Sequence, residues 1–175
     1  SPRALQVTRV RPWSLTEEKL PTHYQAIRSI YEKLSSWSPA IFFGYNSISF
    51  DEEFLRQAFY QTLHPCYLTN TNGSSRGDIL RLMHAVHILA PDTISPVYDD
   101  KGRARFMLDQ LAPNNGFPHK QAHDAMADVE ATIYLAKRVL DEAPHVWDML
   151  LATGDKRGVQ DMLSSQEVLV LCGGN

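Results

Sequence analysis

Pro39-Ala-Ile-Phe-Phe-Gly-Tyr45 is a continuous apolar run, and Asn46-Ser-Ile-Ser-Phe-Asp51 follows it directly. Such a run, bounded by Pro and polar residues, is typical of a strand buried on both faces of a sheet that helices flank. Residues 51–63 then combine an acidic first turn with one apolar stripe, which predicts a helix that begins at or just after Asp51. A strand, a turn and a helix in this order indicate an α/β layer fold.

Apolar residues at steps of three and four predict the remaining helices. These helices cover 16–37 with Pro21 in the first turn, 79–89 with Asp78 as cap, 106–111 closed by a turn at 113–116, 124–141, and two short helices around Gly154 within 147–163. Polar loops are expected at 69–75 and 90–105. Because one clear strand cannot make a sheet, we expect further strands ahead of residue 1 in a longer parent chain.

Composition narrows the class of protein. The chain has 175 residues, is 43% hydrophobic and 21% charged, and carries a net charge of −3. These values suit one globular domain and argue against disorder and against bulk electrostatic coating of nucleic acid. The sequence offers no membrane span, no secretory leader and only two cysteines, so we expect a cytoplasmic protein without membrane association. An apolar run at 167–172 is expected to open a hairpin or sheet.

Asp51 lies where the predicted strand meets the predicted helix. Ligand clefts form at such carboxyl ends of strands in open α/β sheets. Asp is also a preferred helix cap, and Asn46 is a common turn residue. The residues alone leave both interpretations open.

Ala122-His123-Asp-Ala-Met-Ala-Asp128 is a second polar group. Five residues of a helix turn through about 500°, so His123 is expected at or before the helix start and Asp128 in its second turn, from which both reach one cleft. Asp128 borders an apolar face, where a cation would offset the cost of its charge. The alternative is that Asp124 and Asp128 only favour the helix dipole.

Together the two groups resemble the second and third motifs of the DEDD exonuclease superfamily in its histidine-containing branch. The matching patterns are Asn-x-x-x-Phe-Asp after an apolar strand and His-x-Ala-x-x-Asp at a helix start. The likeness is greatest to the bacterial exodeoxyribonuclease I family and covers most of residues 40–141. It implies a ribonuclease-H-like fold, N-terminally incomplete and helix-rich. Residues 1–143 would be a partial exonuclease domain, and residues 144–175 linker helices and the start of a following domain.

The resemblance also implies a reaction and a site. The enzyme would remove nucleotides from the 3′ end of single-stranded DNA with two divalent cations, Mg²⁺ or Mn²⁺, roughly 4 Å apart. Asp51 and Asp128 would be metal ligands, and His123 would accept the proton of the attacking water. Asn46, Phe50 and Arg105 would contact the substrate. A monomer is expected, with a single-strand-binding protein as a further partner.

Two departures from the family pattern bear on activity. The family begins with an Asp-x-Glu pair on its first strand, and no such pair precedes Asp51 here. With half of the ligands absent, tight binding of two hard cations is not expected, and this segment alone would be inactive. Met107 also stands where the family tends to carry a basic residue, for which Arg103 or Arg105 would substitute.

Two competing interpretations remain at this level. His84-x-x-His87 with His119-x-x-x-His123 has spacing compatible with a zinc site, but no Cys pairs with these residues. The stronger alternative is a catalytically degenerate module that binds single-stranded nucleic acid or a partner protein, with stacking from Trp13, Tyr45 or Phe50. An Asp-x-Glu pair upstream in the parent chain would favour the enzyme.

Overall fold

A computed structural model of the chain describes residues 5–6, 11–16, 20–117, 125–154 and 156–165. Its elements, in chain order, are η1 (Pro12–Thr16), α2 (His23–Trp37), β1 (Ile41–Gly44), α3 (Asp51–Gln61), η2 (Leu68–Asn70), β2 (Ser75–Asp78), α4 (Ile79–Leu89), β3 (Val97–Tyr98), β4 (Ala104–Arg105), α5 (Leu108–Asn114), α6 (Ala125–Glu142), α7 (Pro144–Ala152) and α8 (Lys156–Ser165). The predicted mixed α/β, helix-rich class is confirmed. In this described part of the chain, no helix is long and apolar enough to cross a membrane.

β1 and β2 form a parallel pair in which Ile41 lies opposite Ser75 and Gly44 lies opposite Asp78. Parallel strands end at the same edge of their sheet, so the segments that follow Gly44 and Asp78 meet there. Ser75 was predicted to lie in a loop and β2 was not predicted, because Ser75-Arg-Gly-Asp78 has no apolar run. Steric crowding explains the glycine in this strand, because a Cβ at Gly77 would overlap the ring of Phe43 on β1.

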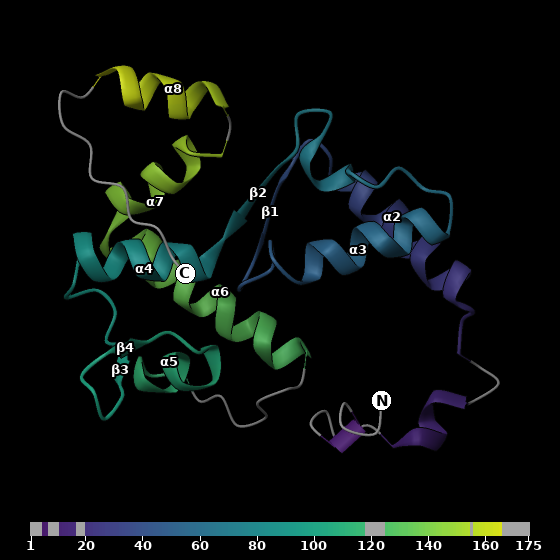
Figure 1. The fold of residues 1–175 in the computed structure, drawn as a ribbon, viewed down its shortest axis with the longest axis horizontal. Coiled ribbons are helices and arrows are strands. Elements are labelled where there is room, and N and C mark those ends of the chain that lie inside the picture. Colours follow the sequence, from purple (N-terminus) through teal and green to yellow (C-terminus); the bar gives the residue numbers. More distant parts are fainter. Residues whose placement is uncertain (1–4, 7–10, 17–19, 118–124, 155, 166–175) are drawn as a thin grey trace.

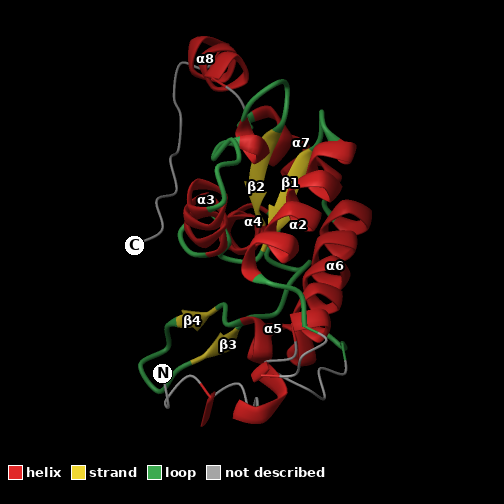
Figure 2. Ribbon diagram, turned by 90° about the vertical axis from the view of Figure 1, so that its right-hand side faces the viewer, coloured by secondary structure: helices red, strands yellow, loops and turns green. Residues whose placement is uncertain are grey.

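Helices lie on both sides of this pair of strands. Figure 1 shows α2 and α3 on one side and α4, α6 and α7 on the other. The short antiparallel hairpin of β3 and β4 lies with α5 at one end of the molecule, as the turned view of Figure 2 also shows. Residues 90–105 were predicted to be a loop, and this hairpin was not predicted, since each of its strands is only two residues long.

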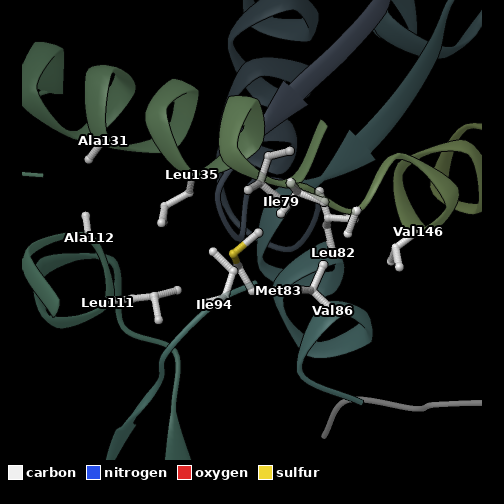
Figure 3. Packing of buried hydrophobic residues seen from close by; sticks show 12 residues of the cluster. Ile79, Leu82, Met83, Val86, Ile94, Leu111, Ala112, Ala131, Leu135 and Val146 are labelled. Atoms are coloured by element: carbon white, nitrogen blue, oxygen red, sulfur yellow. The ribbon is translucent and has the colours of Figure 1, made fainter. Parts of the chain in front are cut away.

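The main apolar core lies between α4, α5, α6 and α7 (Figure 3). Met83 and Val86 of α4, Leu111 of α5 and Leu135 of α6 are completely buried in it. Val146 of α7 belongs to the same cluster, so the helix after Pro144 packs against the rest. A boundary at residue 143 stays a prediction.

β1 is less enclosed than predicted. Ile41 and Phe43 are 46% and 37% exposed, so the expectation of burial on both faces is wrong for this strand. Among the described strands, β1 pairs with β2. Its other edge has no partner strand within the described residues, which is consistent with the expectation that further strands belong to this sheet.

Three features of the helices differ from the prediction, and others agree with it. α2 begins at His23, later than predicted, because Thr22 and Gln25 form a reciprocal capping box; Pro21 lies ahead of the cap. α5 continues through Pro113 to Asn114 instead of ending at 111. Asp128 falls in the first turn of α6 and not in the second. Asp78 caps α4 and Gly116 has the positive φ of a turn, as predicted. The run 167–172 lies outside the described residues.

Candidate active site

Asp51 opens α3 at the carboxyl end of the parallel strands. Phe50 takes the N-cap position and makes no side-chain cap hydrogen bond, so the carboxylate of Asp51 is not used as a helix cap. Partial burial, with Glu52 and Asp78 close by, raises the pKa of Asp51 above its usual value, and the bond to its own backbone N–H partly opposes that rise. A carboxylate that is costly to ionise is suited to a cation partner.

Asp128 shares a hollow with Asp51, although the two residues are far apart in the sequence. The hollow has a volume of about 810 Å³ and lies between the end of β1, the start of α3 and one face of α6. Its walls are mostly apolar, with Phe43, Ile133 and Trp147 among them. The structure thus brings together the two carboxylates that the sequence analysis selected as metal ligands.

A second hollow of about 550 Å³ lies beside the first, and Asp128 lines both. Asn46 and Arg105, two of the predicted substrate contacts, line this second hollow together with His84. Asn46 adopts a positive φ of 56°. Arg105 is half exposed and forms an ion pair with Asp99 at 2.8 Å, so its guanidinium is held at the rim by β4 and the hairpin turn.

The remaining predicted residues have different outcomes. Phe50 is 60% exposed, and its ring packs against Phe54 with 4.9 Å between the centroids. It lines neither hollow. His123, the predicted base, lies outside the described residues. Met107, which stands where the family tends to carry a basic residue, lines the second hollow and is exposed.

Oxygen donors suit a hard divalent cation, and the carboxylates of Asp51 and Asp128 are such donors. Mg²⁺ and Mn²⁺ take about six ligands, of which two carboxylates and bound water make only a part. Within the described residues, no group of three His, Cys, Asp or Glu side chains is placed to hold a metal ion. The two carboxylates are therefore the type of ligand that such a cation prefers, but they do not complete its coordination.

The chain is similar in sequence to bacterial exodeoxyribonuclease I proteins. The chain is 32% identical over 166 residues to exodeoxyribonuclease I of Haemophilus influenzae, an alignment that covers 94% of this chain and 35% of that protein. It is 37% identical over 121 residues to exodeoxyribonuclease I of Escherichia coli, covering 69% of this chain and 26% of the relative. The chain is a homologue of bacterial exodeoxyribonuclease I over most of its length. No protein-family model matches the sequence.

Solved structures agree with this relationship. Exonuclease I of Escherichia coli in complex with a dT13 oligonucleotide superposes with a TM-score of 0.85 at 31% identity, over 92% of this chain and 34% of that one. A complex of exonuclease I with SSB-Ct gives a TM-score of 0.82 at 29% identity, over 93% of this chain and 34% of the other. The chain thus spans about a third of the length of the exodeoxyribonuclease I proteins that it matches.

Two further residues beside the hollows make contacts that were not predicted from the sequence. The hydroxyl of Tyr45 donates to the backbone carbonyl of Phe106 at 2.5 Å, and burial, then the charge of Asp78, raises its pKa well above the usual range. Glu52 is buried next to Asp51 and accepts a hydrogen bond from Thr69 at 2.6 Å. Tyr45 directly after the strand was a usable signal, whereas Glu52 resembled any acid of a first helical turn.

The zinc interpretation has little support. His84 and His87 both pack against the ring of Phe106, with centroid distances of 4.6 and 5.5 Å. Burial lowers the pKa of His84, and His87 contributes to that fall. His119 and His123 lie outside the described residues. In the described part of the chain the two histidines thus serve as packing groups on α4.

Proposed function

We propose that the chain is the latter part of the catalytic domain of a 3′→5′ exonuclease, which hydrolyses single-stranded DNA from its 3′ end and releases nucleotides. The finer fold assignment, a ribonuclease-H-like exonuclease fold, is part of the same proposal. The observation that carries it is the common hollow of Asp51 and Asp128 at the carboxyl ends of β1 and β2. Solved relatives bound to an oligonucleotide support the substrate class.

The proposed roles follow from the chemistry of the side chains. Asp51 and Asp128 would hold the divalent cations, Mg²⁺ or Mn²⁺, in the hollow that both residues line. When bound, such ions activate the attacking water and stabilise the leaving 3′ oxygen. His123 would take the proton of the water, a role suited to an imidazole that titrates near neutral pH. Asn46 and Arg105 would contact the nucleotide, and Phe50 would stack on a base.

The remaining metal ligands would come from an Asp-x-Glu pair on a strand ahead of residue 1. The half-exposed face of β1 and the apolar wall of α6 border the hollow where such a strand would pack. Without it, the segment alone is proposed to be inactive. A single-strand-binding protein is proposed as a partner because a relative was solved as a complex with SSB-Ct.

A nuclease assay on the longer parent chain tests the proposal. With Mg²⁺ and a 5′-labelled single-stranded oligonucleotide, we expect a ladder that shortens from the 3′ end. Asp128→Asn should lower kcat by at least about 100-fold, as expected when a metal ligand is lost. Glu130→Gln is the matched control, because Glu130 is an exposed acid of the same helix. Equal activity of the Asp128 variant and the wild type would refute the assignment of Asp128.

A second candidate is a catalytically degenerate module that binds single-stranded nucleic acid or a partner protein. It is favoured by the lack of a third metal-binding side chain among the described residues of the site. This candidate predicts oligonucleotide binding that is the same with Mg²⁺ and with EDTA, and no cleavage by the parent chain. The exonuclease predicts cleavage that EDTA abolishes.

A further inference from the structure

Asp78 is a buried carboxylate at the end of β2, directly opposite Gly44, the last residue of β1. Its side chain is almost fully enclosed, since the residue is only 3% exposed. A buried charge is costly unless hydrogen bonds compensate it. In the described part of the chain these bonds come from three backbone N–H groups, those of Asn46, Ile48 and Leu80.

The three donors belong to two different segments. Leu80 lies in the first turn of α4, and its N–H donates to Oδ1 at 3.0 Å, which is an ordinary helix cap. Asn46 donates to the same oxygen at 2.8 Å, and Ile48 donates to Oδ2 at 3.4 Å. These last two bonds cross to the turn that connects β1 to α3. Capping of α4 does not account for these two bonds.

One residue of that turn has an uncommon backbone conformation. Asn46 has a φ of 56°, in the left-handed region that is uncommon for residues other than glycine. Asn tolerates this conformation better than most residues, and the bond from its N–H to Asp78 helps to fix it. Bonds between a carboxylate and backbone N–H groups are among the stronger hydrogen bonds in proteins.

Hydrogen bonds continue from the turn to the start of α3. The carbonyl of Ser47 accepts from the N–H of Phe50 at 3.3 Å and from the N–H of Glu52 at 3.0 Å. Phe50 and Glu52 are the residues on either side of Asp51. The two N–H groups held by Asp78 belong to the neighbours of Ser47. A short path of fixed backbone groups therefore joins the carboxylate of Asp78 to the backbone around Asp51.

We propose that Asp78 is a positioning residue, which fixes the 46–50 turn and with it the place of Asp51 at the hollow that Asp51 and Asp128 both line. Asp78 itself lines neither hollow. It acts through the backbone of the turn, and its cap of α4 anchors that turn to the main core. The catalytic part of this inference rests on the proposed exonuclease function, whereas the structural part does not.

Substitution by serine separates the two tasks of Asp78. Serine is as good a helix cap as aspartate, so Asp78→Ser should keep the bond to Leu80. Its shorter side chain cannot reach the turn as well. In amide hydrogen exchange on this chain, we expect exchange at Asn46 and Ile48 to become at least about tenfold faster, while Leu80 stays protected. Asp78→Asn keeps Oδ1 as an acceptor and should restore most of the protection at Asn46.

Thr22→Ala is the matched control, because it removes the N-cap of a different helix, α2, through bonds to Gln25. It should leave exchange at Asn46 and Ile48 as in the wild type. Unchanged exchange at both amides in Asp78→Ser would overturn the proposal. So would faster exchange at Leu80 alone, since that result means that Asp78 acts as a helix cap and does not hold the turn.

Activity of the longer parent chain supplies the second readout. Asp78→Ser should lower kcat by about 10- to 100-fold, the usual effect of losing a group that orients a metal ligand, with little change in KM for the oligonucleotide. Faster exchange at Asn46 and Ile48 with an unchanged kcat would overturn the positioning role. If the wild-type parent does not cleave DNA, the proposed function fails, and the exchange result still decides whether Asp78 holds the turn.

Discussion

The ionised carboxylate of Asp51 lowers the stability of the folded chain. Burial raises the pKa of its carboxyl above the usual 3.8, so its charged form is disfavoured in the folded chain. A raised carboxyl pKa contributes stability below pH 3.8 that is lost as the pH rises through the folded-state value. Functional sites commonly carry such a cost, which a bound cation would offset.

Asp51→Asn should therefore stabilise the chain at pH 7 in metal-free buffer. The expected gain in the free energy of unfolding is less than about 1 kcal/mol, because solvent screens a group this exposed. The gain should disappear below about pH 3.8. Denaturant melts from pH 3 to 7 with EDTA would measure it. Glu53→Gln, in the same first turn, should show no gain, because an acid there favours the helix dipole. A destabilised Asp51→Asn at pH 7 would contradict this account.

Single residues could be selected from sequence only where a pattern surrounds them. Asp51 and Asp128 were each ambiguous alone and were selected because, in their strand and helix settings, they match two motifs of one family. Asp78 was recognised as a cap of the next helix, yet its bonds to Asn46 and Ile48 depend on the pairing of β1 with β2. Long-range bonds of this kind leave no local pattern, so the second task of Asp78 could not be predicted.

At the scale of elements, the contact between β1 and β2 depends on one glycine. Phe43 lies opposite Gly77, and its ring occupies the space that a Cβ would need. Gly77→Ala should force the ring or the strand to shift, at a cost of about 1–3 kcal/mol in the free energy of unfolding. The double variant Phe43→Leu with Gly77→Ala should recover part of that loss, as measured by a double-mutant cycle in urea. Strict additivity would show that the ring does not cause the cost.

Helices of this chain were easier to predict than strands. A helix such as α4 carries both a cap and a sustained apolar period, and both were visible in the sequence. β2 is four residues long and mostly polar. β3 and β4 are each two residues long. Their stability comes from partners elsewhere in the chain, so short polar strands give almost no local signal. The end of α5 was predicted too early, because Pro113 was taken as the residue that ends the helix.

At the scale of the whole molecule, the apolar surface is divided unevenly. The core between α4, α5, α6 and α7 is closed, whereas α6 also presents a second apolar stripe to the hollow. Val129, Ile133 and Leu140 of this stripe are 51%, 47% and 45% exposed. The sequence predicted one amphipathic helix at 124–141, but periodicity alone could not show that its two faces would have different neighbours.

This uneven surface gives a test of the expected upstream strand. Ile133→Ser should change the free energy of unfolding of the present chain by less than about 1 kcal/mol, because the side chain is half exposed and the two residues have similar helix propensities. In a longer parent chain whose upstream strand covers the hollow, the same change should cost about 2–5 kcal/mol, as for a buried isoleucine. Leu135→Ala is the control, since Leu135 is fully buried in the core and should cost about as much in both chains. Urea denaturation of the two lengths measures the difference. An equally small cost of Ile133→Ser in both would mean that no upstream strand packs on α6, and the missing carboxylates would then have to reach Asp51 and Asp128 from another direction.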